Sequence, residues 1–420
     1  MFDELTTRDR QVNWHPYSQM KTTTHIPILS GKGSYLFDAD GNRYIDAVSS
    51  WWVTLHGHAH PYIADKVYEQ LQCLEQVIFA GFTHQPAITL SERLLDLLPA
   101  NQTKVFYSDN GSTAVEVALK MCIQFAHQSG KKKNKILAFK EGYHGDTFGA
   151  MSVSERGIWT APFQDLLFEV IFIDTPNSSN LEELYALIDQ HASELACFIY
   201  EPLVQGAGGM LMHTAEALSQ LMRHCRDRGV ILIQDEVFVG FGRTGTLFAA
   251  NQLSEQPDLM CFSKGLTGGT MPLGVTSCRE EIYQAFYADE KKRAFFHGHS
   301  FTASPIACAA SLASLDLLLQ ADTFEAIERI GKQHTAFAEQ VRSVPVIEAV
   351  RQCGTILAMD WRVGETSYFN NMQEQLYKKF LAEGILMRPL GNTVYIVPPY
   401  CISEEDLNNV YDSILKIAEQ

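Results

Sequence analysis

Two short stretches decide the fold: residues 230–236 read VILIQDE, and residues 259–264 read LMCFSK. Each is an apolar run that ends in polar or charged side chains. Such apolar runs are typical of strands that are covered on both faces, as in parallel sheets. Five further β-rich runs lie between residues 104 and 278, with helical patterns between them: KVFYS, ILAFK, VIFI, CFIY and VTSC. This alternation predicts an α/β fold with a mostly parallel sheet flanked by helices.

The outer segments indicate further parts of the molecule. Residues 34–48, SYLFDADGNRYIDAV, place Asp40-Gly41 between two alternating apolar runs, which is the strongest short-range signal for a β-hairpin. Beyond Pro305 the chain is rich in Ala and Leu and is predicted to be helical to about residue 343. Short strands and helices follow, and Ser403 with Asp406 is predicted to cap the last helix.

A chain of 420 residues exceeds the usual size of one hydrophobic core. We therefore expect three parts: an N-terminal arm and hairpin over residues 1–50 that packs with the small domain, a large domain over 51–309, and a smaller α+β domain over 310–420.

Composition excludes several classes of protein. The 33 Lys and Arg against 49 Asp and Glu give a formal charge of −16, which argues against nucleic-acid and anionic-membrane partners, because these need clustered cations. The nine cysteines form no Cys-x-x-Cys pair, which argues against a disulfide framework or zinc ribbon and for a reducing compartment. The opening MFDELTTRDRQVNW is too polar for a signal peptide, and no apolar run approaches the ~18 residues of a membrane span. We expect a cytoplasmic protein.

Polar residues that follow the strands are the first candidates for a site, because ligands bind at the carboxyl ends of strands in open α/β sheets. Residues 108–113, SDNGST, follow KVFYS. There Gly111 allows close approach, and the free N–H groups of a first helical turn, with the Ser112 hydroxyl, suit a phosphate. An ordinary helix cap is the alternative. The segment matches neither a dinucleotide fingerprint nor a P-loop.

Three more candidates follow other strands. Asp235 ends a buried strand, where a carboxylate must find a cation or donors. Lys264 follows LMCFS at the start of a glycine-rich loop. Burial there would lower the pKa of its amine and make it a nucleophile for a carbonyl carbon. The alternative is an ordinary lysine whose amine reaches the surface. Tyr143 and His144 lie between Gly142 and Gly145. An aromatic ring there could face a planar ligand, or it could only fill space within the loop.

Together these four places supply what is needed to hold pyridoxal phosphate: a phosphate cradle, an aromatic face, a buried acid and a lysine. The lysine binds the cofactor aldehyde covalently. The aspartate keeps the pyridine nitrogen protonated, so that the ring can act as an electron sink.

Five ordered motifs resemble the class III (ω-amino) pyridoxal-phosphate aminotransferases over nearly the whole chain: SDNGSTAVEVALKM (108–121), EGYHGDTFGAMS (141–152), EPLVQGAGGM (201–210), DEVFVGFGRTG (235–245) and FSKGLTGGTMPLG (262–274). The resemblance implies the fold type I of these transferases. It also implies that Lys264 carries the cofactor, Asp235 pairs with the pyridine nitrogen, Gly111 and Ser112 bind the phosphate, and Tyr143 lies by the ring and substrate.

The family is dimeric, and in it a segment like residues 297–300, His-Gly-His-Ser, reaches the neighbouring subunit's phosphate. The resemblance therefore implies a homodimer with shared active sites, in which Gly298 helps to bind substrate and His299 and Ser300 help to bind cofactor. Ser300 keeps the hydroxyl of the usual threonine. His299 stands where a proline is commoner in the family.

A finer resemblance is to the branch of the family that aminates 8-amino-7-oxononanoate in biotin synthesis. It rests on WHPY (14–17), SSWW (49–52), ILMRP (385–389) and VPPY (397–400). By it, Tyr17 and Trp52 line the substrate pocket, Tyr17 acts in catalysis with Lys264, and Arg388 binds a distal carboxylate. An aliphatic acid needs such aromatic walls and one guanidinium. S-adenosylmethionine is the usual amino donor of this branch and some members use lysine; no residue decides between them.

Other interpretations stay open at this point. An ω-aminotransferase for ornithine, GABA or β-alanine is disfavoured by Trp51-Trp52 and Tyr17. A nucleotide-dependent oxidoreductase lacks its glycine fingerprint, and a non-catalytic relative would not need the lysine, aspartate and tyrosine together. His56, His58 and His60 alternate as metal ligands would on a strand, but Gly57 and Pro61 favour a loop, so no metal site is predicted. Arg243 is either a second anion contact or part of a structural salt bridge.

Overall fold

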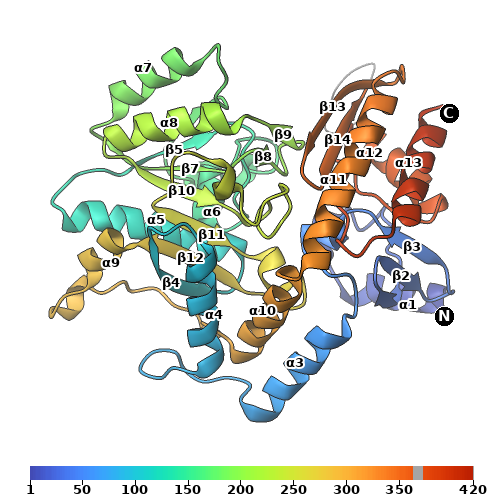
Figure 1. The fold of residues 1–420 in the computed structure, drawn as a ribbon, viewed down its shortest axis with the longest axis horizontal. Helices are drawn as coiled ribbons and strands as arrows, with labels where there is room; N and C mark the ends of the chain where they lie inside the picture. Colours follow the sequence, from blue (N-terminus) through green and yellow to red (C-terminus); the bar gives the residue numbers. More distant parts are fainter. Residues whose placement is uncertain (363–371, 420) are drawn as a thin grey trace.

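A seven-stranded sheet forms the centre of the molecule, which we describe from a computed structural model of residues 1–362 and 372–419 (Figure 1). Its strand order is β4-β12-β11-β10-β7-β5-β6. All seven predicted strands are present: β4 (Gln102–Ser108), β5 (Lys135–Phe139), β6 (Val170–Ile173), β7 (Leu195–Tyr200), β10 (Ile231–Asp235), β11 (Leu259–Phe262) and β12 (Gly274–Arg279). Every pair is parallel except those of β12, which runs antiparallel to both neighbours. The predicted mostly parallel α/β fold is confirmed.

Helices cover both faces of this sheet, which explains the apolar strands. Ile231 and Ile233 pack in the cluster that contains the buried face of α5 (Gly111–Gln128). Leu232, between them, packs with the buried side chains of α8 (Ala215–Asp227) on the other face. Successive side chains of a strand point to opposite faces, so a strand covered on both sides must be apolar throughout. Further helices of this part are α3 (Pro61–Cys73), α4 (Gln85–Leu97), α6 (Phe148–Val153), α7 (Leu181–His191) and α9 (Glu280–Phe286).

The N-terminal arm forms α1 (Phe2–Val12), β1 (Ile28–Lys32) and the predicted hairpin of β2 (Tyr35–Asp38) and β3 (Arg43–Asp46). Gly41, in the hairpin turn, has a φ of +85°, which a glycine adopts without strain. β3 also pairs in parallel with β15 (Ile385–Leu386), so the arm lies beside the C-terminal residues, as Figure 1 shows. The division of the chain at residues 50 and 309 stays a prediction.

Beyond Pro305 the predicted helix is two helices, α10 (Pro305–Leu318) and α11 (Ala321–Val341), bent by 70° at the break. Among the described residues no single helix is long and apolar enough to cross a membrane. Only the two helices of this bent pair, taken together, reach the length and apolar composition of a membrane span. The C-terminal part adds a separate three-stranded antiparallel sheet and two helices: β13 (Ile347–Cys353), β14 (Ile356–Trp361), β16 (Thr393–Ile396), α12 (Met372–Ala382) and α13 (Glu404–Ala418). The Ser403 Oγ accepts a hydrogen bond from the Asp406 N–H at 3.0 Å, so the predicted cap is present.

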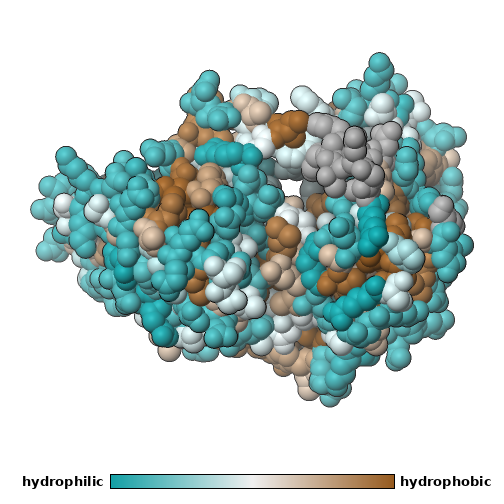
Figure 2. Space-filling model, turned by 90° about the horizontal axis from the view of Figure 1, so that it is seen from above, coloured by the Kyte–Doolittle hydropathy of each residue, from teal (hydrophilic) through white to brown (hydrophobic). Residues whose placement is uncertain are grey.

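The surface is largely hydrophilic on the face shown in Figure 2, with hydrophobic patches on either side of a hollow near its middle.

Candidate active site

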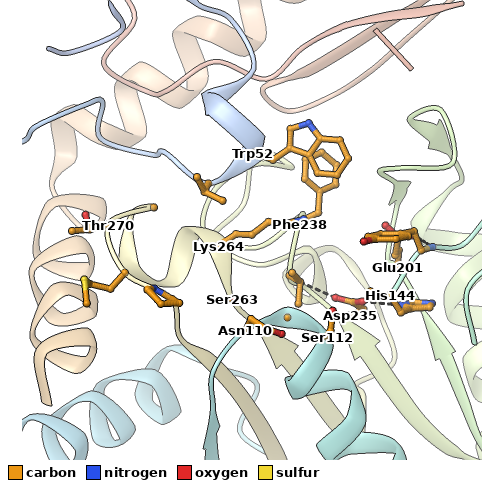
Figure 3. A pocket seen from close by; sticks show the side chains of 18 residues that line it. Trp52, Asn110, Ser112, His144, Glu201, Asp235, Phe238, Ser263, Lys264 and Thr270 are labelled. Atoms are coloured by element: carbon orange, nitrogen blue, oxygen red, sulfur yellow. Dashed lines mark hydrogen bonds and ion pairs between the residues drawn. The ribbon is translucent and has the colours of Figure 1, made fainter. Parts of the chain in front are cut away.

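A pocket of about 410 Å³ lies at the carboxyl ends of the central strands (Figure 3). Its walls include Gly111 and Ser112 after β4, Tyr143 after β5, Asp235 at the end of β10, and Lys264 after β11. The structure thus brings together all four of the places that the sequence indicated. Parallel strands end at one edge of a sheet, so residues far apart in the chain meet there.

The side chain of Lys264 is partly buried in the wall of this pocket. Its Nζ lies 4.7 Å from the ring centre of Trp52 and 5.6 Å from that of Phe238. Burial lowers the pKa of the amine to about 8, although the charges of Asp235 and Glu201 favour the ammonium. Lys264 also has a φ of +46°, a left-handed conformation that is uncommon outside glycine. A surface lysine is therefore excluded, and the amine is placed to react inside the pocket.

Asp235 is fixed by two donors. Its Oδ2 lies 2.7 Å from Nδ1 of the buried His144, and its Oδ1 accepts the Val237 N–H at 2.9 Å. A carboxylate oxygen accepts hydrogen bonds, so the contact with His144 is a hydrogen bond in the ring tautomer that has its proton on Nδ1. Each carboxylate oxygen has a second lone pair, so Asp235 can still bind a protonated ring nitrogen.

Glu201 follows β7 and is a second buried acid of the pocket. It accepts the N–H groups of Tyr143 and Gly206, each at 2.9 Å. Burial raises the pKa of its carboxyl to about 7. Sequence reasoning missed this residue, and it also missed His144 as the partner of Asp235. Glu201 could have been found, because it directly follows the CFIY run.

The first turn of α5 offers an anion site. Asn110 caps this helix by accepting the Thr113 N–H at 3.0 Å, and the helical ladder begins with the Ala114 N–H. The N–H groups of Gly111 and Ser112, which line the pocket, remain for a ligand. A Cβ on Gly111 would lie 2.7 Å from the Val237 Cγ1, so this position has no room for a side chain.

Aromatic residues lie beside and beyond this pocket. Trp52 is buried in its wall, and its Nε1 donates to the Tyr395 hydroxyl at 3.1 Å. Trp51 is 41% exposed and contacts Tyr17 edge to face, with ring centres 5.8 Å apart. The Tyr17 hydroxyl donates to the Asp146 Oδ2 at 2.5 Å. The Arg388 guanidinium lies 4.7 Å from the ring centre of Trp51. Tyr17 and Arg388 are thus grouped through Trp51 and do not line the pocket itself.

The segment at residues 297–300 is not brought to this pocket in the single chain. Gly298 and Ser300 are exposed, and the Ser300 carbonyl accepts from the Gln76 side chain at 2.6 Å. His299 lies against Asp109, with Nδ1 and Oδ2 3.3 Å apart.

The other histidines and Arg243 have separate surroundings. His56 Nε2 lies 3.1 Å from the Ser314 hydroxyl, and His58 Nε2 lies 2.8 Å from Asp46, so these rings do not converge on one point.

The buried Arg243 donates to the Pro398 carbonyl at 2.6 Å and to the Ser49 hydroxyl at 2.9 Å. No carboxylate pairs with it within the described part of the chain. The expected salt bridge of Arg243 is therefore not found among the described residues, where its partners are carbonyl and hydroxyl groups, and a contact of Arg243 with an anion stays a prediction.

Comparison with known proteins identifies the class. The family described as Aminotransferase class-III matches residues 17–418, so the chain belongs to the class-III aminotransferases, as the motifs predicted. Among its relatives, the adenosylmethionine-8-amino-7-oxononanoate aminotransferase of Synechococcus elongatus is 43% identical, over 97% of this chain and 98% of the relative. The enzyme of the same name from Helicobacter pylori is 36% identical over 100% and 98%.

Solved structures agree with this assignment. The crystal structure of the adenosylmethionine-8-amino-7-oxononanoate aminotransferase from Methanocaldococcus jannaschii has a TM-score of 0.96 and 34% identity, covering 99% of both chains. An amine transaminase from an uncultivated Pseudomonas species, in the PLP-bound (internal aldimine) form, has a TM-score of 0.91 and 29% identity, over 97% of this chain and 98% of that one. The fold type I architecture expected from the family is confirmed.

Proposed function

We propose that this chain is a pyridoxal-phosphate enzyme that converts 8-amino-7-oxononanoate to 7,8-diaminononanoate in biotin synthesis. One observation carries the proposal: the amine of Lys264, whose pKa is lowered to about 8, shares a pocket with Asp235 and the open N-terminus of α5. The choice of substrate is supported by the relatives named for it, which match this chain over nearly its whole length.

The residues of the pocket fit this cofactor. The N–H groups of Gly111 and Ser112 suit a phosphate, Asp235 suits a protonated pyridine nitrogen, and Tyr143 lies beside the space between them. When bound, pyridoxal phosphate supplies an aldehyde for the amine and a ring that withdraws electrons from the substrate carbon. His144 would keep the Asp235 carboxylate oriented through the 2.7 Å contact between its Nδ1 and the Asp235 Oδ2.

Lys264 has two tasks in this mechanism. Its amine would hold the cofactor and, when free, would act as the base for the proton on the α-carbon of the amino donor. A pKa of about 8 suits both directions of transfer near neutrality. The rings of Trp52 and Phe238 border the amine and limit the access of water to it.

The substrate would lie toward Tyr17 and Trp52, with Tyr143 between them and the cofactor. The Tyr143 hydroxyl is hydrogen-bonded to Tyr17, so the two phenols form one polar edge along an otherwise aromatic wall. Arg388, above the ring of Trp51, supplies the positive charge for the distal carboxylate of the keto acid. We propose Tyr17 as a residue that positions substrate and Lys264 as the group that moves the proton.

The amino donor is proposed to be S-adenosylmethionine, on the support of the relatives' names. Lysine is the alternative. Half-reaction spectra with each amine distinguish them, because only a true donor discharges the yellow form of the enzyme.

A homodimer completes the proposed site. Gly298, His299 and Ser300 do not line the pocket of their own chain, so in this proposal they serve the neighbouring subunit, with Ser300 at its phosphate.

The experiment that tests the function compares acceptors and donors on one preparation. The holoenzyme should aminate 8-amino-7-oxononanoate, and ornithine, GABA or β-alanine should be poor donors. Lys264→Ala should abolish turnover, and borohydride should bleach the parent protein and label Lys264. Lys378→Ala is the matched control, because Lys378 is an exposed lysine paired with Glu374 on α12. Near-normal turnover by Lys264→Ala, or a colourless protein that binds no pyridoxal phosphate, would refute the proposal.

A further inference from the structure

We propose that Asp9, His15 and His25 form a site for a divalent transition-metal ion such as Zn²⁺, separate from the pocket of Lys264. Their ligand atoms, one from each side chain, all lie within 4.8 Å of one another. None of the three lines the catalytic pocket. Two imidazoles and one carboxylate are a common ligand set for zinc, with water at the fourth position.

The carboxylate of Asp9 is already turned toward both rings. Its Oδ2 lies 2.8 Å from the His15 Nε2 and 3.8 Å from the His25 Nδ1. The Asn13 side chain donates to the Asp9 Oδ1 at 2.8 Å. Such a donor behind a ligating carboxylate holds it in place and is typical of metal sites.

The ring of His25 lacks the hydrogen bonds expected of a partly buried imidazole. Its Nδ1 is too far from Asp9 for a hydrogen bond, and its Nε2 is buried without a partner among the residues that the structure describes. A buried polar atom without a partner costs free energy. An ion bound to Nδ1 gives this ring a polar partner on the side that faces the carboxylate.

The protonation states also suit a cation. Hydrogen bonds from Asn13, then from His15, hold the pKa of Asp9 below its usual range, so it is ionised at neutral pH. Burial, then the neighbouring His15, lower the pKa of His25, which leaves its imidazole neutral and able to ligate. The two rings are stacked, with centres 3.7 Å apart.

Two features oppose binding and set its strength. Arg10 donates to the Thr23 carbonyl at 3.4 Å and adds a positive charge near His25. The interplanar angle of the rings is only 14°, so one ring must tilt for both nitrogens to point at one ion. We therefore expect micromolar rather than nanomolar affinity.

The consequence of binding would be local. Asp9 lies on α1, and His15 and His25 lie on either side of Tyr17 in the segment that follows. An ion at this place would tie that segment to α1 and restrict the backbone that carries Tyr17.

The test is equilibrium dialysis of the holoenzyme against Zn²⁺ under reducing conditions, with metal analysis. We expect one Zn²⁺ per chain, and an affinity at least ~10-fold weaker in Asp9→Asn and in His25→Gln, because each removes one of three ligands. His127→Ala, which removes an exposed histidine at the end of α5, should bind as the parent does. The visible spectrum and circular dichroism of each variant confirm that it is folded.

Two results would overturn the proposal. One is a parent protein that retains no stoichiometric Zn²⁺ at 100 micromolar free metal, a concentration chosen to exceed a micromolar dissociation constant about a hundredfold. The other is unchanged binding in both folded variants, since the ion would then lie elsewhere, for instance on the exposed thiols of Cys73 or Cys401.

Discussion

At the scale of single residues, Lys264 is held in a place that its charge disfavours. Burial lowers its pKa from the ordinary value of 10.5 to about 8. A tenfold change in proton affinity corresponds to ~1.4 kcal/mol, so the folded apoprotein loses up to ~3 kcal/mol of stability at neutral pH. Functional groups often cost stability in this way, because the reaction needs an amine where packing would prefer a hydrocarbon.

This cost predicts that Lys264→Met stabilises the cofactor-free protein at pH 7 by up to ~3 kcal/mol. The sign follows from the two states. Below pH 8 the lysine is charged in both, and only the folded state bears the burial cost. As the pH rises from about 8 to 10.5 the cost disappears, because the amine becomes neutral. Urea unfolding at pH 7 and pH 10 checks this, with Lys378→Met as control. A gain that does not shrink at pH 10 would contradict the account.

His144 should affect catalysis through Asp235 alone. Replacing it with Leu removes a hydrogen bond to a carboxylate, worth ~1.5–3 kcal/mol, so kcat should fall ~10- to 100-fold. His144→Asn, whose amide can donate in place of Nδ1, should recover most of this loss. Single-turnover rates measure the effect. Equal losses in both variants would indicate damage to packing instead of to the hydrogen bond.

The sequence located Lys264 and Asp235 because each follows its own apolar strand, which is a local signal. It did not reveal that His144 donates to Asp235. That contact exists because β5 and β10 both flank β7. The order of strands in a sheet cannot be predicted from the sequence of any single segment.

At the scale of elements, caps were predictable and bends were not. The Ser403 cap of α13 depends on residues within one turn, and the structure contains it. The break between α10 and α11 contains no glycine or proline, so the local sequence does not predict it. α10 packs against α3 and α4, whereas α11 packs against β13 and α13. The bend is therefore imposed by tertiary contacts.

Ser403→Ala should lower the free energy of unfolding by ~1 kcal/mol, because the Asp406 N–H loses its acceptor at the start of α13. Ser413→Ala is the matched control in the same helix, where the hydroxyl bonds only the carbonyl one turn back. Urea denaturation of the holoenzyme measures both variants. A control variant as unstable as Ser403→Ala would show that the cap contributes nothing.

At the scale of the whole molecule, residues 298–300 lie outside the pocket of their own chain. If they complete the neighbouring site, the holoenzyme sediments at twice the mass of the chain. Ser300→Ala then weakens pyridoxal-phosphate binding ~10-fold, through the loss of a hydrogen bond to a charged phosphate. Ser343→Ala, an exposed serine after α11, should have no effect. A monomeric holoenzyme with full cofactor affinity would exclude the shared site.

The sequence indicated the class of enzyme because five motifs keep their order along the chain. The fine chemistry of the substrate was less accessible, because Tyr17, Trp51 and Arg388 come from segments that meet only in the folded protein.

The most direct test of the central claim is a single turnover. The enzyme is first converted to its amine form with S-adenosylmethionine, freed of donor, and mixed with 8-amino-7-oxononanoate. We predict one 7,8-diaminononanoate per active site, together with return of the yellow cofactor spectrum. No product from this acceptor, with full turnover of the semialdehyde derived from GABA, would contradict the proposed function while leaving the class of enzyme intact.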